Sequence, residues 1–230
     1  MKIKLIRITI ISFTIFFTSC AETSFKKEEI APQNLSEWKT LDKGKTIING
    51  EELIIEETEG SNGYFLVSPK IYKGDIILNY KVKAMSEASV IIVLFSVSDI
   101  GETLEMTMPP RDAKGTDFWR WRTALEHYNL TFNNRAHNFK PFFFKNETPL
   151  KKGFHQRLSE NIIETEKWYD VEVGKKQNRL WFKLNNKVIF EQEDCNPLDG
   201  GRLMFRISGL NGDKVVFAKI AMKNLVISYQ

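Results

Sequence analysis

The sequence predicts an all-β fold, a two-sheet antiparallel sandwich with jelly-roll connections. Apolar residues recur at every second position in short segments that end at glycine, proline or asparagine, which is typical of strands with one buried face. No segment shows a sustained helical stripe, and no internal repeat is evident. The 230 residues, of which 42% are hydrophobic and 12% aromatic, are enough for one well-packed domain.

The first residues are arranged as in a secretory signal. Lys2, Lys4 and Arg7 precede a short apolar run over residues 8–17, which is too short to span a bilayer. The run ends in Phe-Thr-Ser before Cys20. This order resembles a bacterial lipoprotein signal, in which the cysteine is lipidated, although phenylalanine takes the place of the usual leucine. The alternative is a plain signal peptide with an incidental cysteine.

The chain is therefore expected to divide into three parts. Residues 1–19 form a lipoprotein signal peptide, residues 20–34 a polar, flexible tether, and residues 35–230 a jelly-roll domain. The protein would then lie in the cell envelope of a bacterium, at the outer membrane or facing the periplasm. Its N-terminal lipid alone would hold it to the membrane.

Charge and cysteine content exclude several classes of protein. The chain has 33 basic residues, and 33 less the three in the signal leaves 30, which balance 29 acidic residues. Nucleic acid is therefore not an expected partner. With Cys20 lipidated, Cys195 has no disulfide partner, and no C-x-x-C spacing exists for a zinc site. Cys195 is expected to be buried and inert.

Strand-like segments follow one another to the end of the chain. They are expected at residues 52–57, 64–67, 75–83, 90–97, 168–173, 179–184, 188–191, 202–208 and 215–229. Because residues 90–97 are almost all apolar, this strand should be central and covered on both faces. Farther on, Leu203, Phe205 and Ile207 should be buried, with Arg202 and Arg206 on the opposite face of their strand.

The middle of the chain, residues 101–167, is irregular and longer than a compact domain needs for its connections. Long ordered loops of this kind are usually functional. Residues 139–145 are rich in phenylalanine. Two interpretations are open for them: a buried strand, which is favoured, and a platform on which sugars stack.

The unusual chemistry gathers between residues 117 and 137. From His127 the side chains alternate, so that Tyr128, Leu130 and Phe132 fall on one side of a strand. The other side presents hydrogen-bonding groups only, namely His127, Asn129, Thr131 and Asn133. This row either faces water or binds a polar ligand.

Two short patterns resemble known proteins. The first is Leu-Asp-Gly-Gly over residues 198–201 with Phe205 and Arg206, followed by residues 223–227. It resembles the last strands of concanavalin A-like jelly rolls, most of all those of the YesU-type family of bacterial sugar-utilisation proteins and more distantly the 3-keto-disaccharide hydrolase family. The second, residues 126–133, is similar to the Tyr-His-x-Ser-Tyr strand of the YesU type, with the first two residues inverted and no match for the serine. The resemblance implies a polysaccharide context.

The motifs of common hydrolases are missing from the sequence. The Glu-x-Asp-x-x-Glu strand of retaining β-glucanases has no match, so a glycosidase would need carboxylates from separate strands. Nucleophile-elbow, P-loop and H-E-x-x-H motifs are also missing.

A lyase acting on a uronate needs a base and cations that hold the carboxylate. Such groups are available at His127, Tyr128, His137 and His155 and at Arg120, Arg122, Arg135 and Arg157. A non-catalytic sugar binder needs only aromatic faces and hydrogen-bonding groups, and Trp119, Trp121 and Trp181 are candidates for the faces.

The expected function is to bind or modify poly- or oligosaccharides, as a lipid-anchored glycoside hydrolase or polysaccharide lyase. The alternatives are a non-catalytic glycan-binding lipoprotein of a polysaccharide-utilisation system and a structural envelope protein without a sugar ligand. The catalytic candidates are Glu126, His127 and Tyr128. The candidates for substrate binding are Trp119, Arg120, Trp121, Arg122, Asn129, Thr131, Asn133, Arg135, His137 and Arg206. No cofactor is expected, although loops at Asp194, Asp199 and Asp213 could hold a structural calcium ion.

Overall fold

The computed structural model describes residues 24–101, 103–133, 140–146, 152–210 and 215–230. Its strands are β1 (Lys26–Ile30), β2 (Lys39–Leu41), β3 (Gly44–Asn49), β4 (Glu52–Glu57), β5 (Tyr64–Lys73), β6 (Ile76–Ala84), β7 (Val90–Asp99), β8 (Leu125–Asn133), β9 (Phe142–Asn146), β10 (Lys152–Arg157), β11 (Trp168–Lys176), β12 (Arg179–Leu184), β13 (Lys187–Glu193), β14 (Gly200–Ser208) and β15 (Lys219–Tyr229). Its helices are α1 (Pro32–Ser36) and α2 (Thr116–Thr123).

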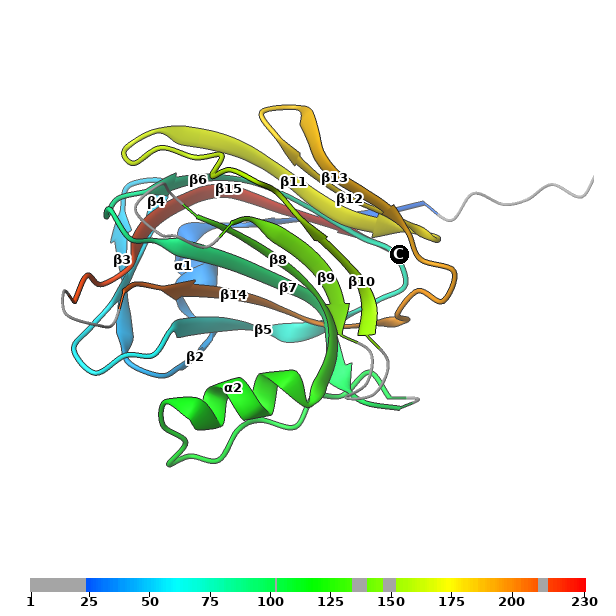
Figure 1. Cartoon of the computed structure of the whole chain (residues 1–230), viewed down its shortest axis with the longest axis horizontal. Helices are drawn as coiled ribbons and strands as arrows, with labels where there is room; N and C mark the ends of the chain where they lie inside the picture. The colour runs from blue at the N-terminus through cyan, green and yellow to red at the C-terminus, as the bar shows by residue number, and fades with distance from the viewer. Residues whose placement is uncertain (1–23, 102, 134–139, 147–151, 211–214) are drawn as a thin grey trace, which may run out of the picture.

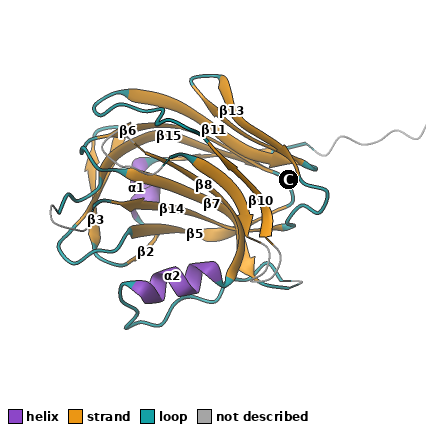
Figure 2. Cartoon of the chain, viewed as in Figure 1, coloured by secondary structure: helices purple, strands orange, loops and turns teal. Residues whose placement is uncertain are grey.

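The described strands form two antiparallel sheets stacked face to face (Figures 1 and 2). An eight-stranded sheet has the order β13-β12-β11-β6-β15-β4-β3, with β1 also paired to β15. A seven-stranded sheet has the order β10-β9-β8-β7-β14-β5-β2. The predicted all-β sandwich is confirmed. Consecutive strands pair in β3-β4, β7 to β10 and β11 to β13, and pairing between strands distant in sequence, such as β6 with β15 and β7 with β14, joins these groups into the two sheets.

The main core fills the space between the sheets. In β7, the side chains of Ile91, Val93 and Phe95 point into it, while Ile92 and Leu94 belong to a second apolar cluster on the outer face of the seven-stranded sheet. The expectation that this strand is buried on both faces is therefore confirmed. The second cluster exists because α2 and the segment before it cover part of that outer face, as Figure 1 shows.

The helix α2 is a departure from the sequence analysis, which predicted no helix. Its charges follow the helix dipole, with Asp117 in the first turn and Arg120 and Arg122 in the last. Phe118 and Trp121 pack on Phe65 of β5, each with a centroid separation of 6.0 Å. The short helix is held by this contact with the sheet, which no local pattern predicts.

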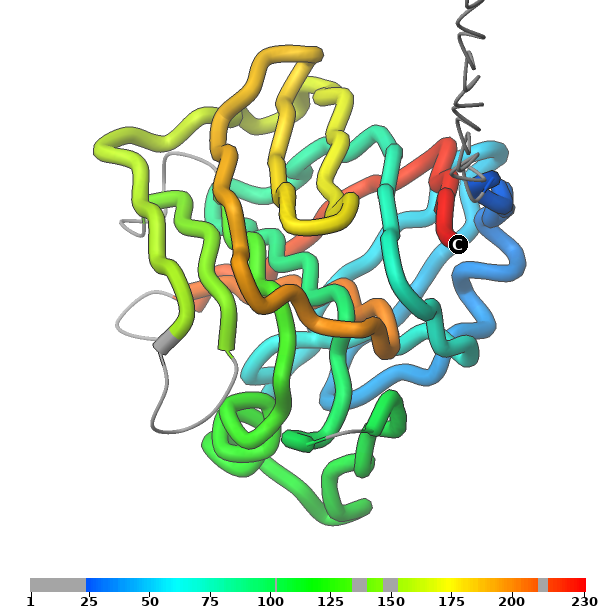
Figure 3. The backbone as a smooth tube through the Cα atoms, turned by 90° about the vertical axis from the view of Figure 1, so that its right-hand side faces the viewer, coloured from blue at the N-terminus to red at the C-terminus, as the bar shows by residue number. Residues whose placement is uncertain are grey.

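The beginning of the domain also differs from the expected boundary. Residues 26–30, which were expected in the tether, form β1 and pair with β15 from Lys26 opposite Tyr229 to Ile30 opposite Leu225. The first described strand therefore lies beside the C-terminus, as Figure 3 shows. The polar composition of residues 26–30 does not predict a strand. The strand forms nevertheless, because its main-chain hydrogen bonds to β15 do not depend on side-chain type. Among the described residues, no helix is long and apolar enough to cross a membrane.

Buried charges close one end of the sandwich. The ammonium group of Lys145 lies 3.0 Å from Asp194, whose carboxylate also accepts a 2.7 Å hydrogen bond from the Tyr128 hydroxyl. Lys175 donates to the carbonyl of Leu198 at 2.7 Å. These bonds fix the segment between β13 and β14 across the edge of the core. Breaking one buried ion pair costs about 3–5 kcal/mol in proteins.

Candidate functional site

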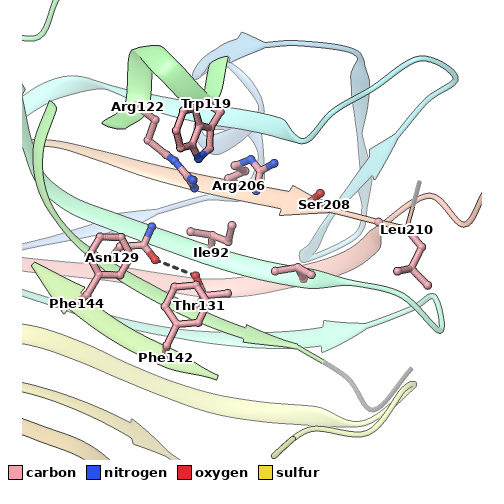
Figure 4. Close-up of a pocket in the computed structure, with 12 residues that line it drawn as sticks. Ile92, Trp119, Arg122, Asn129, Thr131, Phe142, Phe144, Arg206, Ser208 and Leu210 are labelled. Carbon is pink, nitrogen blue, oxygen red and sulfur yellow. Dashed lines mark hydrogen bonds between the residues drawn. The ribbon is translucent and has the colours of Figure 1, made fainter. Parts of the chain in front are cut away.

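The outer face of the seven-stranded sheet carries a pocket of 490 Å³ where α2 leaves the sheet uncovered (Figure 4). Strands β7, β8, β9 and β14 form its floor and one wall, and α2 forms the opposite rim. Its lining residues are Val90, Ile92, Trp119, Arg122, Asn129, Thr131, Phe142, Phe144, Arg206, Ser208, Gly209 and Leu210.

The floor of the pocket has a polar row on β8. Asn129 and Thr131 face the pocket because alternate residues of a strand share a face. Thr131 donates a 2.8 Å hydrogen bond to the amide oxygen of Asn129, drawn as a dashed line in Figure 4. This bond occupies the amide oxygen and leaves the NH₂ group of Asn129 to donate to a ligand.

An aromatic wall adjoins this row on β9. Phe144 lies opposite Asn129 and Phe142 opposite Thr131 in the strand pairing. The two rings stack on each other with centroids 5.8 Å apart, and His155 of β10 packs edge-on against both, at 5.8 and 6.0 Å. Phe143 lies between them and points into the core, so the buried strand is confirmed, and a sugar-stacking platform at Phe142 and Phe144 stays a prediction.

Trp119 faces the pocket from the other side. It lies on α2 with 60% of its surface exposed, while its helix neighbours Phe118 and Trp121 cover the sheet. Tryptophan is costly to leave exposed, because its large apolar surface stays in water. Figure 4 shows its indole over the pocket, above the guanidinium groups of Arg122 and Arg206.

Two arginines from distant parts of the chain meet in this pocket. Arg206 of β14 donates a 2.7 Å hydrogen bond to the carbonyl of Asn62, and its guanidinium lies 5.3 Å from the ring centre of Phe65. A side chain at Gly63 would collide with that guanidinium, so this glycine makes room for it. Burial, together with the charge of Arg122, lowers the pKa of Arg206 to about 9, and burial lowers the pKa of Arg122. A pKa of about 9 leaves Arg206 charged at neutral pH, and an arginine as a rule stays protonated in proteins.

His127 lies two residues before Asn129 on the same face of β8, with its ring 5.8 Å from that of Phe144, and does not line the pocket. Its side chain is 1% exposed, and its Nδ1 donates a 2.9 Å hydrogen bond to the carbonyl of Leu125, which leaves Nε2 as an acceptor without a partner among the described residues. Burial, and secondly the charge of Arg122, lowers the pKa of His127 to about 3. The imidazole is therefore neutral at physiological pH. The expectation that His127 lines an open cleft is wrong.

The three catalytic candidates do not meet. Tyr128 points into the core, where its hydroxyl donates to Asp194 at 2.7 Å and accepts from the backbone N–H of Leu198 at 2.9 Å. Neighbouring residues of a strand point to opposite faces, which separates Tyr128 from His127. Glu126 is half-buried and does not line the pocket. The structure therefore assembles no catalytic group from these three residues.

Four other residues that were predicted to contact a sugar do not line the pocket. Arg120 is exposed and lies 3.8 Å from Asp117 in an ion pair. Trp121 packs on the sheet and donates to the carbonyl of Thr107 at 2.7 Å. Asn133 is buried at the end of β8. Trp181 lies on the eight-stranded sheet, where its indole N–H donates to Glu172 at 2.6 Å.

The remaining predictions concern residues outside the pocket. Arg135, His137, Asp213 and the lipidation residue Cys20 lie outside the described residues. Cys195 is exposed, so the expectation that it is buried is wrong. No group of three or more His, Cys, Asp or Glu side chains that could hold a metal ion occurs within the described ranges.

Five of the pocket residues were predicted from the sequence as binding candidates, and others were not. Trp119, Arg122, Asn129, Thr131 and Arg206 were predicted and line the pocket. Phe142 and Phe144 were included only in the less favoured interpretation of residues 139–145, the sugar-stacking platform, although their spacing on either side of Phe143 indicates that one face of the strand could carry them. Ser208, one period after Arg206 on β14, could have been found in the same way.

Solved structures identify the fold. No family model matches the chain, and no curated protein matches it in sequence. A protein of unknown function with a galectin-like fold from Bacillus subtilis is 13% identical, with 90% of this chain and 99% of that chain covered and a TM-score of 0.68.

Two further structures are similar. The Bacillus licheniformis beta-glucanase is 10% identical over 91% of this chain and 99% of that chain, with a TM-score of 0.56. The carbohydrate-binding module CBM66 from Bacillus subtilis is 15% identical over 84% of this chain and 95% of that chain, with a TM-score of 0.50. The chain has a galectin-like, concanavalin A-like jelly roll. At these identities the likeness establishes the fold.

Proposed function

We propose that the chain binds a poly- or oligosaccharide in the pocket between α2 and strands β7, β8, β9 and β14. The observation that carries the proposal is the arrangement of an exposed indole, Trp119, across from the stacked rings of Phe142 and Phe144, with Asn129 and Thr131 between them. A sugar ring needs this combination. Its apolar C–H face packs on aromatic rings, and its hydroxyls need amide and hydroxyl partners.

The similar structures agree with a sugar ligand. Among them are a carbohydrate-binding module and a beta-glucanase, and both share the sandwich over most of this chain. The resemblance of residues 126–133 and 198–206 to the YesU-type family has the same implication. A fold hosts many functions, so the composition of the pocket remains the stronger support.

The pocket favours binding without turnover. Glycoside hydrolysis requires two carboxyl groups on either side of the scissile bond, and no carboxylate is among the described residues that line the pocket. A lyase base works best with a pKa near the working pH, whereas the pKa of His127 is lowered to about 3 and its ring is buried. The non-catalytic glycan-binding protein is therefore the preferred alternative, and hydrolase or lyase activity stays a prediction.

A binding experiment with a panel of neutral and acidic glycans tests this proposal. Trp119→Ala should weaken binding about tenfold or more, since it removes one of the two aromatic faces, and glycan chain length should stay unchanged on incubation. The matched control is Trp181→Phe, which alters a tryptophan on the other sheet. Equal binding by wild type and Trp119→Ala would exclude this pocket, and shortening of the glycan would establish an enzyme instead.

The proposal includes an N-terminal lipid anchor on Cys20. Its support is the basic, apolar and small-residue order before this cysteine. Cys20→Ser should move the protein from the membrane fraction to the soluble fraction or leave its signal uncleaved. Recovery of the wild type as a soluble protein without lipid would contradict the anchor.

A further inference from the structure

Two guanidinium groups share the pocket, and neither has an acidic partner among the described residues. Arg122 comes from the last turn of α2 and Arg206 from the middle of β14, and Figure 4 shows both extending beneath Trp119. The charge of Arg122 is one cause of the lowered pKa of Arg206, which indicates that they interact. Two like charges brought together in a partly buried site destabilise each other unless an opposite charge joins them.

The described residues supply no such opposite charge. The side chain of Arg122 makes no ion pair or hydrogen bond within the described ranges, and the Arg206 guanidinium has one hydrogen bond there, to a neutral carbonyl. The acidic groups that act on Arg206 from a distance are Glu57 and Asp42. Both are already bonded to other groups.

The bonds of these two carboxylates are all to uncharged donors. Glu57 accepts from Ser61 Oγ at 2.9 Å and from the backbone N–H groups of Gly209 and Ala218 at 2.6 and 2.9 Å. Asp42 accepts from the backbone N–H groups of Lys43 and Asn62 at 2.8 and 2.9 Å. They hold the loops around the pocket, and neither forms an ion pair with the arginines among the described contacts.

We infer that the glycan bound here is acidic, and that Arg122 and Arg206 together hold a carboxylate or sulfate group on it. This inference rests on the proposed sugar-binding function. A guanidinium presents parallel N–H donors that match the two oxygens of such a group, and charged hydrogen bonds of this kind are about twice as strong as neutral ones. The opposite wall is aromatic, so the pocket fits a ring with one apolar face and an anionic substituent.

The competing explanation is that the arginines serve the fold alone. Arg206 packs on Phe65 and bonds to Asn62, which a structural role would also explain. That role does not explain Arg122, which has no such bond within the described ranges and still lines the pocket. It also predicts that removing either charge changes stability and leaves ligand preference unchanged.

Matched polymers separate these explanations. The probes are polygalacturonate with its fully methyl-esterified form, and dextran sulfate with dextran, titrated at equal ionic strength. The wild type should bind at least one acidic polymer about tenfold or more tightly than its neutral partner. The polygalacturonate arm reports a carboxylate, and the dextran sulfate arm reports a sulfate.

Single arginine variants locate the effect. Arg122→Gln and Arg206→Gln should each weaken binding of the acidic polymer about tenfold and leave the neutral polymer unchanged. Arg120→Gln and Arg202→Gln are the matched controls, on the same helix and the same strand, because neither residue lines the pocket. They remove the same charge and should bind as wild type does. Arg206→Lys keeps the charge but loses the parallel N–H donors of the guanidinium. If thermal melting shows an intact fold, its affinity for the acidic polymer should lie between those of the wild type and Arg206→Gln.

Three results would overturn the inference. If acidic and neutral polymers bound equally and Trp119→Ala still weakened binding, the pocket would be a site for neutral sugars. Only the inference of an anionic group on the glycan would then be refuted. If Arg120→Gln and Arg122→Gln weakened binding of the acidic polymer equally, the effect would come from the overall charge of the protein and not from the pocket. If none of the four polymers binds and the glycan panel fails as well, both the inference and the proposed function fall.

Discussion

The two outward faces of the sandwich differ in how their cationic side chains are paired with acidic ones. On the eight-stranded sheet, lysines lie beside acids on neighbouring strands, with Lys81 2.7 Å from Asp170 and Lys183 2.8 Å from Glu172. On the seven-stranded sheet, Arg122 and Arg206 share a pocket, and no acid pairs with them among the described residues. Both faces belong to one fold, so the difference does not follow from architecture.

The difference supports the proposal that the seven-stranded sheet binds the ligand. Cross-strand ion pairs keep a solvated face soluble and contribute little to stability. Unpaired, partly buried cations cost free energy in the unliganded protein, and that cost is relieved only by an anion. An exposed tryptophan lies on the same face as the unpaired cations. On the other face, Trp181 is buried and bonded to Glu172, and Trp168 is partly buried, with the ammonium groups of Lys83 and Lys223 over its ring at 5.1 and 4.3 Å.

The largest effect on stability is expected from Phe205 of β14, whose neighbour Arg206 lies on the opposite face of the strand. Phe205 packs between the sheets against Trp38 and Tyr80, at centroid separations of 6.0 and 5.5 Å. Phe205→Ala should lower the free energy of unfolding by about 3–5 kcal/mol, measured by denaturant titration. Arg206→Gln should cost far less stability and change binding instead. A loss below about 1 kcal/mol for Phe205→Ala would place the core on the other face of the strand.

The buried histidine of the pocket face should give an intermediate effect that depends on pH. Because the pKa of His127 is about 3 in the folded protein and about 6.5 when unfolded, the unfolded chain binds more protons between these values. The contribution of His127 to stability is therefore complete above pH 6.5 and is lost as the pH falls toward 3.

Comparison with His127→Gln isolates this titration from that of the carboxylates. The difference in unfolding free energy between wild type and variant should shift against the wild type by about 1.4 kcal/mol per pH unit between pH 6 and 4. Chemical denaturation at several pH values measures it. Parallel stability profiles for the two proteins would mean that His127 is accessible to water in the folded state.

The smallest effect is expected on the paired face. Lys183→Gln removes one partner of a half-exposed ion pair with Glu172, and should change the unfolding free energy by less than about 1 kcal/mol. Binding of glycans should be unchanged. If Lys183→Gln weakened binding as strongly as Arg122→Gln does, the two faces would not differ in function.

Some features of the site could be predicted because they are local. The alternation of β8 separates Tyr128, Leu130 and Phe132 from Asn129 and Thr131, and the structure keeps this separation. Arg206 was placed opposite Phe205 by the same rule. The rule could not tell that His127 is buried and lines no pocket while Asn129 lines it, because both lie on the same face. The packing of α2 and β9 over the strand decides that difference.

By itself the sequence determined the fold class and, in the strands that it predicted, the side that each residue occupies, since a period of two depends only on the chain's own backbone. The order of the strands was decided by the tertiary structure. Hydrogen bonds between distant segments place β14 beside β7 and β5, and contact with Phe65 holds α2 over the sheet. Only this packing brings Trp119 and Arg122 over Arg206 and opposite Phe142 and Phe144. The pocket is a product of long-range pairing, and no local pattern contains that information.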